Sequence, residues 1–186
     1  MQIVLWLLDF VCGFFSFALL ARFLMQWTRA PFRNPLGQFV VAVTDWMLRP
    51  LRRLIPGLFG LDVASLLLAW LWQAAYLGLS LGATGALVAV SSAPIFTVAL
   101  LALVETVKIG FHLMIGAVLV SAILSWVNPH APAADAIHAV SQPLLRPFQR
   151  LIPLVGGVDL SPLALLLLLQ VSLSMLERLR LAILMS

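Results

Sequence analysis

The chain has 186 residues, of which 63% are hydrophobic and only 10% charged, and its mean hydropathy is +1.10. A soluble globular domain is about half apolar and about a quarter charged, so this composition excludes an ordinary soluble protein and indicates one embedded in lipid. The net charge of +4 does not favour nucleic-acid binding, because nearly all basic residues stand in short loops beside apolar stretches, as membrane topology requires.

The first apolar stretch covers residues 3–27, long enough to cross about 30 Å of hydrocarbon. Asp9 stands near its start and Arg22 near its end. Arg22 is expected to snorkel to the interface, and Asp9 either lies at the opposite headgroup level or lines a polar path. Cys12 is the single cysteine, so it makes no intrachain disulfide and is expected to pack in the apolar helix.

A polar loop, residues 28–62, follows this span. Within it, residues 36–49 carry apolar side chains at helical spacing, which predicts a helix lying in the plane of the interface. Pro50 is expected to begin a second, short helix, because a proline fits the first helical position. Asp62 stands directly before the next apolar run, where it would cap the helix with its carboxylate.

The second and third spans are predicted at residues 63–81 and 95–126. Gln73 lies in the middle of the second span, where it needs a polar partner on another helix. The third span is longer than one crossing needs, so either it is tilted or its first turns lie outside the hydrocarbon. Its charged positions Glu105, Lys108 and His112 share one helical face, either as an ion pair near the interface or as a proton or ion relay.

The second half repeats this plan, with a loop at residues 127–159, a fourth span at 160–176 containing Gln170, and an amphipathic tail with Glu177, Arg178 and Arg180. No metal site is expected. The loop residues His130, Asp135 and His138 match no zinc spacing and have no thiolates beside them, so they are interpreted as solvated.

A fifteen-residue motif ends each polar loop. Residues 48–62 read LRPLRRLIPGLFGLD and residues 145–159 read LRPFQRLIPLVGGVD, without a gap and with nine identical positions. Such internal repetition indicates an architecture of repeated units. The repeated residues of interest are Arg49, Pro50, Arg53, Pro56, Gly60 and Asp62, and then Arg146, Pro147, Arg150, Pro153, Gly157 and Asp159.

These patterns predict an all-α membrane protein with four transmembrane helices. The helices form two parallel helix–loop–helix repeats, residues 1–90 and 95–186, each with a short amphipathic interfacial helix in its loop. With four spans, both motif loops fall on one side and both termini on the other. Seven arginines lie on the motif side, so the positive-inside rule places the motif loops in the cytoplasm and the termini outside.

Two interpretations of the motif stay open. Its arginines serve as anchors to anionic headgroups or contact a ligand or partner, and its aspartates cap helices or bind ions. We expect Arg53 to pair with Asp62, and Arg150 with Asp159, folding each loop back on its own span.

The paired blocks RPLRRLIP…G.D and RPFQRLIP…GGVDLSP resemble the YggT family, related to the plastid YlmG and Ycf19 proteins, and the resemblance covers nearly the whole chain as two tandem repeats. Repeat two has the more typical pattern, whereas repeat one has Asp62-Val63-Ala64-Ser65 where the family pattern is D-L-S-P. The resemblance implies a small polytopic protein of the bacterial inner membrane. It also implies an association with osmotic or ion tolerance, envelope and division organisation, or membrane-complex assembly, without a defined activity.

Two functions are therefore expected from different classes. The first is a non-catalytic membrane scaffold or assembly factor, homo-oligomeric or bound to a cytoplasmic or membrane protein, with anionic lipid at its motif loops. The second is an ion channel or transporter for osmotic and ion homeostasis, with a polar path of Asp9, Gln73, Glu105, Lys108, His112 and Gln170. No enzyme activity and no cofactor are expected, because nucleophile, metal and paired-carboxylate patterns are missing from the sequence.

Overall fold

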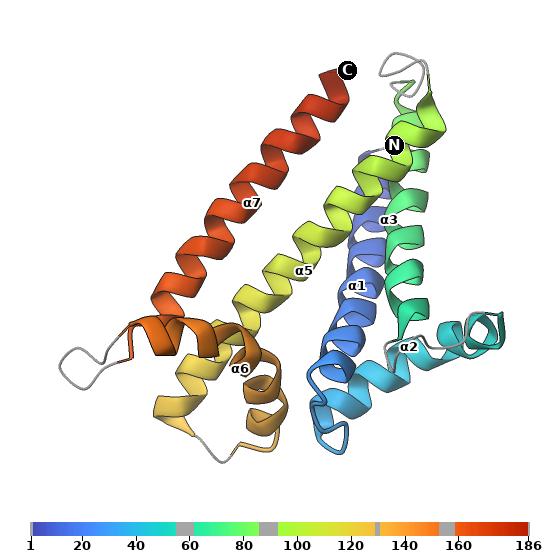
Figure 1. Cartoon of the computed structure of the whole chain (residues 1–186). Helices are drawn as coiled ribbons and strands as arrows, with labels where there is room; N and C mark the ends of the chain where they lie inside the picture. Colours follow the sequence, from blue (N-terminus) through green and yellow to red (C-terminus); the bar gives the residue numbers. More distant parts are fainter. Residues whose placement is uncertain (1, 55–61, 86–92, 129–130, 153–158, 186) are drawn as a thin grey trace.

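The structure is a computed structural model that describes residues 2–54, 62–85, 93–128, 131–152 and 159–185. These residues form helices and no strand (Figure 1). The long apolar helices are α1 (Gln2–Trp27), α3 (Val63–Ala83), α5 (Pro94–Val127) and α7 (Ser161–Met185), and the amphipathic ones are α2 (Pro35–Leu54) and α6 (Ala134–Leu151). Among the described helices, α1, α3, α5 and α7 are long and apolar enough to cross a membrane, which confirms an all-α protein with four candidate spans.

The two ends of the molecule differ in the elements that lie there (Figure 1). Both termini, and the ends of α3 and α5 that flank the central link, lie at one end, and α2 and α6 lie at the other. We call the end with α2 and α6 the motif end. At 34 residues, α5 is about 51 Å long, well beyond the hydrocarbon thickness. It runs inclined to α1 and α3 (Figure 1).

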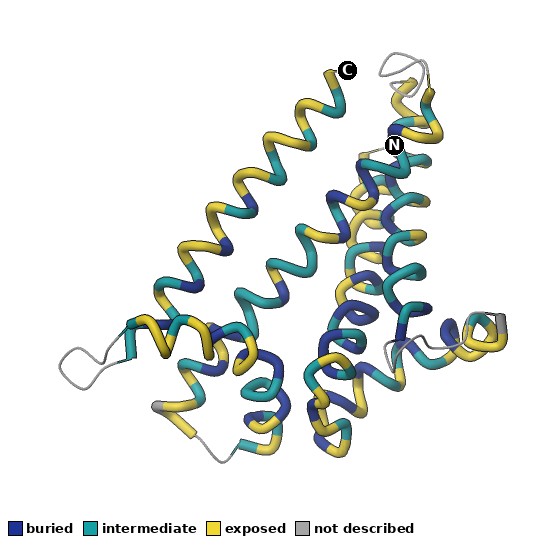
Figure 2. The backbone as a smooth tube through the Cα atoms, in the orientation of Figure 1, coloured by how far each residue is buried: buried dark blue, intermediate teal, exposed yellow. Residues whose placement is uncertain are grey.

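The fourth long helix corrects one prediction. Residues 161–185 form a single helix, so the segment from Glu177 onward is not a separate amphipathic tail. The residues Leu163, Leu167, Val171 and Met175 are more than half exposed along α7. An apolar helix face of this size is stable in lipid and not in water. The exposed residues recur along α7 (Figure 2), so most of this helix can lie within the membrane.

Pro50 does not begin a new helix as predicted, and neither does its equivalent Pro147. Pro50 lies inside α2, and Pro143 and Pro147 lie inside α6, which visibly bends (Figure 1). A proline inside a helix frees the carbonyl four residues before it and bends the helix. Each amphipathic helix nevertheless continues through its proline residues.

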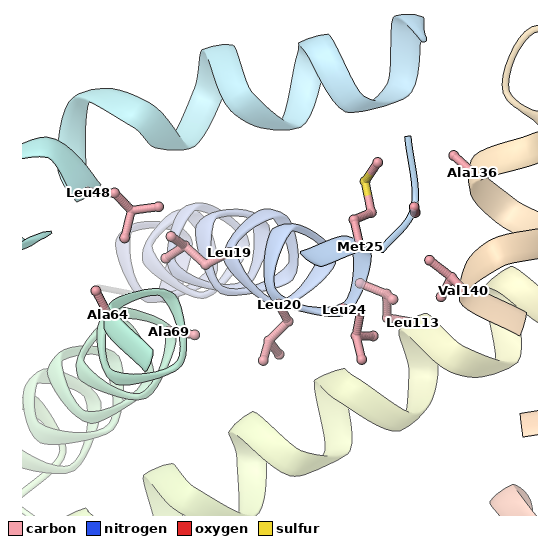
Figure 3. Close-up of a cluster of buried hydrophobic side chains, with 11 residues drawn as sticks. Leu19, Leu20, Leu24, Met25, Leu48, Ala64, Ala69, Leu113, Ala136 and Val140 are labelled. Carbon is pink, nitrogen blue, oxygen red and sulfur yellow. The ribbon is translucent and has the colours of Figure 1, made fainter. Parts of the chain in front are cut away.

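The main hydrophobic core lies where the two halves of the chain meet (Figure 3). Leu19, Leu24 and Met25 of α1 pack in one cluster with Leu113 of α5 and Val140 of α6. The same cluster includes Leu48 of α2 and Ala64 and Ala69 of α3. Both amphipathic helices are thus packed onto the long ones. The division into separate units at residues 1–90 and 95–186 stays a prediction.

Candidate functional site

Arg22 of α1 organises the motif end of the first half. It is only 6% exposed, and its guanidinium donates to Thr44 Oγ1 at 2.8 Å and to Asp45 Oδ1 at 3.1 Å, both on α2. Asp62 Oδ2 lies 3.9 Å from its Nε. Carboxylates on two other segments therefore compensate the buried charge of Arg22.

Asp62 is the buried anion of this cluster, with 4% of its surface exposed. The Arg52 guanidinium forms an ion pair with its Oδ2, and Ser65 Oγ donates to the same oxygen at 2.6 Å. Burial alone would raise the pKa of Asp62, but the hydrogen bonds from Arg52 and Ser65 and the charges of Arg52 and Arg22 outweigh it, so the pKa lies below its usual value.

Asp62 also corrects the predicted cap. It occupies the N-cap position of α3, but its carboxylate accepts no backbone N–H there. The carboxylate turns instead toward the side chains of Arg52 and Ser65, because a charged partner offers a stronger hydrogen bond than a backbone N–H. The aspartate of the first motif therefore ties α2 to α3.

The second motif makes the same contact without charge on the donor. Gln149, at the position equivalent to Arg52, donates to Asp159 Oδ2 at 2.9 Å. Asp159 Oδ1 accepts the backbone N–H of Ser161 at 2.9 Å, so this aspartate does cap the start of α7. Hydrogen bonds from Ser161, together with the one from Gln149, hold the pKa of Asp159 below its usual value against a smaller desolvation effect.

The expected pairs Arg53–Asp62 and Arg150–Asp159 are wrong by one residue. Arg53 and Arg150 are exposed, and the contacts come from the residue before each of them. The reason is helical geometry. Arg52 and Gln149 lie on the side of their helices that faces the following span, about 100° around the axis from Arg53 and Arg150.

The remaining motif residues are either exposed or outside the described residues. Arg49 is exposed and forms an ion pair with Asp45 at 2.7 Å. The pKa of Asp45 lies below its usual value, mainly because its carboxylate accepts a hydrogen bond from Arg22. Arg146 is also exposed. Pro50 and Pro147 lie within α2 and α6. Pro56, Gly60, Pro153 and Gly157 lie outside the described residues.

In the second half, two serines and a histidine join α5 to α6 where the first half has the Arg22 cluster. Ser121 of α5 bonds His138 Nδ1 at 2.7 Å and accepts a hydrogen bond from Ser141 Oγ at 3.1 Å, both on α6. Ser141 is the repeat equivalent of Thr44, 97 positions later in the chain. His138 is thus engaged in the packing of α6 and is not free in a solvated loop.

The predicted polar path is partly assembled. A cavity of about 440 Å³ between α1, α3 and α5 is lined by Asp9, Gln73, Glu105 and His112, together with apolar residues. Gln73 donates to Ser16 Oγ at 3.1 Å, which supplies the interhelical partner that a glutamine in lipid requires. His112 Nδ1 bonds the carbonyl of Lys108 at 2.8 Å. Gln170 is exposed on α7, away from this cavity.

Lys108 belongs to a different group. It lies 2.6 Å from Glu177 Oε2 and 3.3 Å from Glu105 Oε2, while Arg180 lies 2.8 Å from Glu105 and 3.0 Å from Glu177. These four side chains, two acidic and two basic, join α5 to α7. The roles of Glu177 and Arg180 were not predicted from the sequence, although their spacing matches that of Glu105 and Lys108 with the charges in the same order.

No solved structure is significantly similar to this chain. Sequence comparison finds relatives that are uncharacterized proteins. One is YggT of Escherichia coli, 39% identical over 173 residues, which cover 92% of this chain and 87% of that protein. Another, from Pseudomonas aeruginosa, is 37% identical over 161 residues, 86% of this chain and 80% of that protein. A Haemophilus influenzae protein is 28% identical over 159 residues, 83% of this chain and 80% of that protein.

The profile of one protein family matches the chain twice. Its two matches cover residues 1–82 and 100–180, so each contains one copy of the arginine and aspartate motif. Together they span most of the sequence and agree with the resemblance read from the motif itself. The chain is a multi-pass membrane protein that belongs to the CCB3/YggT family and carries two tandem copies of the family repeat.

Proposed function

We propose that the protein is a non-catalytic scaffold or assembly factor for envelope, division or other membrane complexes, acting from the bacterial inner membrane. The observation that carries this proposal is the fixed position of α2. The buried Arg22 and Asp62 tie it to α1 and α3, and the same helix exposes Arg49 and Arg53.

The second amphipathic helix supports the same proposal. α6 lies at the same end of the molecule as α2 (Figure 1) and exposes Arg146 and Arg150 at equivalent motif positions. A rigid pair of basic helices at one membrane surface suits anionic headgroups, at about 1 kcal/mol for each basic residue. It equally suits an acidic partner protein or a second copy of this chain.

Native gel electrophoresis of solubilised membranes tests the scaffold role. Tagged wild-type protein is expected in an assembly larger than the free chain. Replacing Arg49, Arg53, Arg146 and Arg150 by glutamine should release it at low mass. The matched control is Arg178→Gln, which removes an exposed arginine of α7. Migration of the quadruple variant with the wild type would reject the arginines as the docking surface.

We further propose that the motif end faces the cytoplasm. Cysteine labelling tests this orientation in a Cys12→Ser background. In intact cells, an impermeant maleimide should label Met185→Cys, whose parent side chain is 83% exposed, and should label Arg53→Cys only after the cells are opened. The reverse pattern would place the motif end outside.

A second candidate function is ion transport, favoured by the cavity that brings Asp9, Glu105 and His112 together. Proteoliposomes with a potassium or sodium gradient test it. Transport should be abolished by Asp9→Asn and retained in Arg178→Gln. Absence of flux above empty liposomes, with folded protein, would leave the scaffold as the function of the chain.

A further inference from the structure

A second cavity, of about 430 Å³, lies between the two halves of the chain. We call it the inter-repeat groove. Every residue that lines it is apolar, and the residues come from α1, α2, α5 and α6. On α1 the lining runs from Phe14 to Met25, and Gly116 of α5, Leu36 of α2 and Ala136 of α6 line the other sides.

The groove has the dimensions of a single lipid chain. Phe14 and Met25 are eleven residues apart on one helix, a distance of about 16 Å. An extended acyl chain of this length would contact only apolar side chains along the groove.

The direction of the groove also suits a lipid. Its Met25, Leu36 and Ala136 end lies at the motif end, where the amphipathic helices α2 and α6 mark the headgroup level, and its Phe14 end lies deeper along α1 (Figure 1). Apolar cavities do not retain water. An acyl chain entering from the headgroup level would run down this groove toward the middle of the membrane.

Two arginines stand at the headgroup end. Arg29 and Arg33 lie in the segment between α1 and α2, and Ala30 of that segment packs in the same cluster as Ala136 and Val140 of α6. Neither arginine forms an ion pair with a carboxylate of the described residues. Their positive charge is available to an anion at this point.

The backbone at Arg29 gives an independent reason to assign it a role. Arg29 has a φ of 56°, and the N–H of Ala30 bonds the carbonyl of Met25 at 2.8 Å. This is the helix-ending geometry in which glycine is usual, because a side chain is strained there. An arginine at a position that favours glycine indicates that its side chain is needed.

We propose that the inter-repeat groove holds one acyl chain of an anionic phospholipid, with the phosphate at Arg29 and Arg33. This site is distinct from the repeated motif, whose arginines lie on α2 and α6. The lipid would fill the space between the two halves and hold them in one arrangement. The proposal stands independently of the scaffold and transport functions.

Native mass spectrometry of the delipidated protein, with phosphatidylglycerol or phosphatidylethanolamine added back, tests the proposal. We expect one tightly bound phosphatidylglycerol. Gly116→Leu should weaken this binding at least about tenfold, since a Cβ at Gly116 meets open space and the longer side chain would fill the groove. Gly110→Leu is the matched control, because Gly110 is also on α5 with open space at its Cβ but does not line the groove.

The arginines are tested separately. Arg33→Gln and Arg29→Gly should each lower the preference for phosphatidylglycerol over phosphatidylethanolamine about fivefold, as expected for one basic residue at a headgroup. Arg29→Gly should at the same time keep or raise the unfolding temperature, because glycine relieves the strained φ. Loss of preference with retained stability distinguishes headgroup binding from a structural role.

Three results would overturn the proposal. The first is equal lipid binding by Gly116→Leu and Gly110→Leu. The second is an absence of preference between the two lipids in the wild type. The third is a lipid-free dimer whose cross-links pass through residues of the groove, which would make a second copy the occupant.

Discussion

Gln149 donates to Asp159 across ten residues, as Arg52 does to Asp62 in the first motif. Both motifs therefore make the same side-chain contact, but the donor is charged only in the first motif. In the first half the aspartate is buried and needs a cation, whereas Asp159 is exposed enough for an amide and a backbone N–H to suffice. The two motifs share a geometry and differ in electrostatics.

The first prediction follows from this difference. Gln149→Arg should reproduce the pair of the first motif and stabilise the protein by up to about 1 kcal/mol, the range of exposed ion pairs. Thermal unfolding in detergent measures it, and added salt should remove the gain. In contrast, Arg52→Gln should destabilise, because Asp62 would lose a charged partner. Destabilisation by Gln149→Arg would mean that Asp159 is not accessible to a guanidinium.

The second prediction concerns Arg22. Arg22→Met should cost about 3–5 kcal/mol, because it leaves the buried Asp62 without part of its compensation and Thr44 without its donor. Arg49→Met is the control. The Arg49 side chain is 78% exposed, so its loss should cost about 1 kcal/mol or less. Similar unfolding temperatures for the two variants would contradict a central role for Arg22.

The repeated motif, the four spans and the excess length of α5 could be predicted from the sequence, because each depends on local composition and length. The partners of Arg22 could not. Its interaction with Thr44 and Asp45 requires α2 to lie across the end of α1, and no local pattern determines that contact. The Arg53–Asp62 error has the same origin, since the loop path determines which neighbouring arginine faces the aspartate.

The third prediction is a pH dependence. The pKa values of Asp45, Asp62 and Asp159 are all lowered in the folded protein. Groups of this kind contribute stability that is present above the unfolded pKa of about 4 and is lost as the pH falls through the lower folded pKa. The unfolding temperature should therefore be constant from about pH 7 to 5 and fall below about pH 4.

Asp62→Asn provides the control for this titration. The variant should be less stable at neutral pH, because Arg22 and Arg52 lose their shared anion, and its stability should change less between about pH 5 and 3 than that of the wild type. An equal loss of stability in both proteins on acidification would assign the effect to other carboxyl groups.

The fourth prediction concerns the link between α5 and α7. Lys108→Met and Glu177→Met should each destabilise, because each leaves an ionic side chain without its partner across the helix pair. The double variant should lose less than the sum of the two, by about 1–3 kcal/mol, since the pair is removed together. A double-mutant cycle in detergent unfolding measures this coupling.

The matched comparison for this cycle is Lys108→Met with Gln170→Met. Gln170 is an exposed polar residue of α7, so its replacement should add independently, within about 0.5 kcal/mol. Coupling between Lys108 and Glu177 that is no larger than this would mean that Arg180 and Glu105 hold the two helices together without them. Either result defines which of the four charges positions α7. Among the described helices, the main contacts of α7 are with α5 and α6.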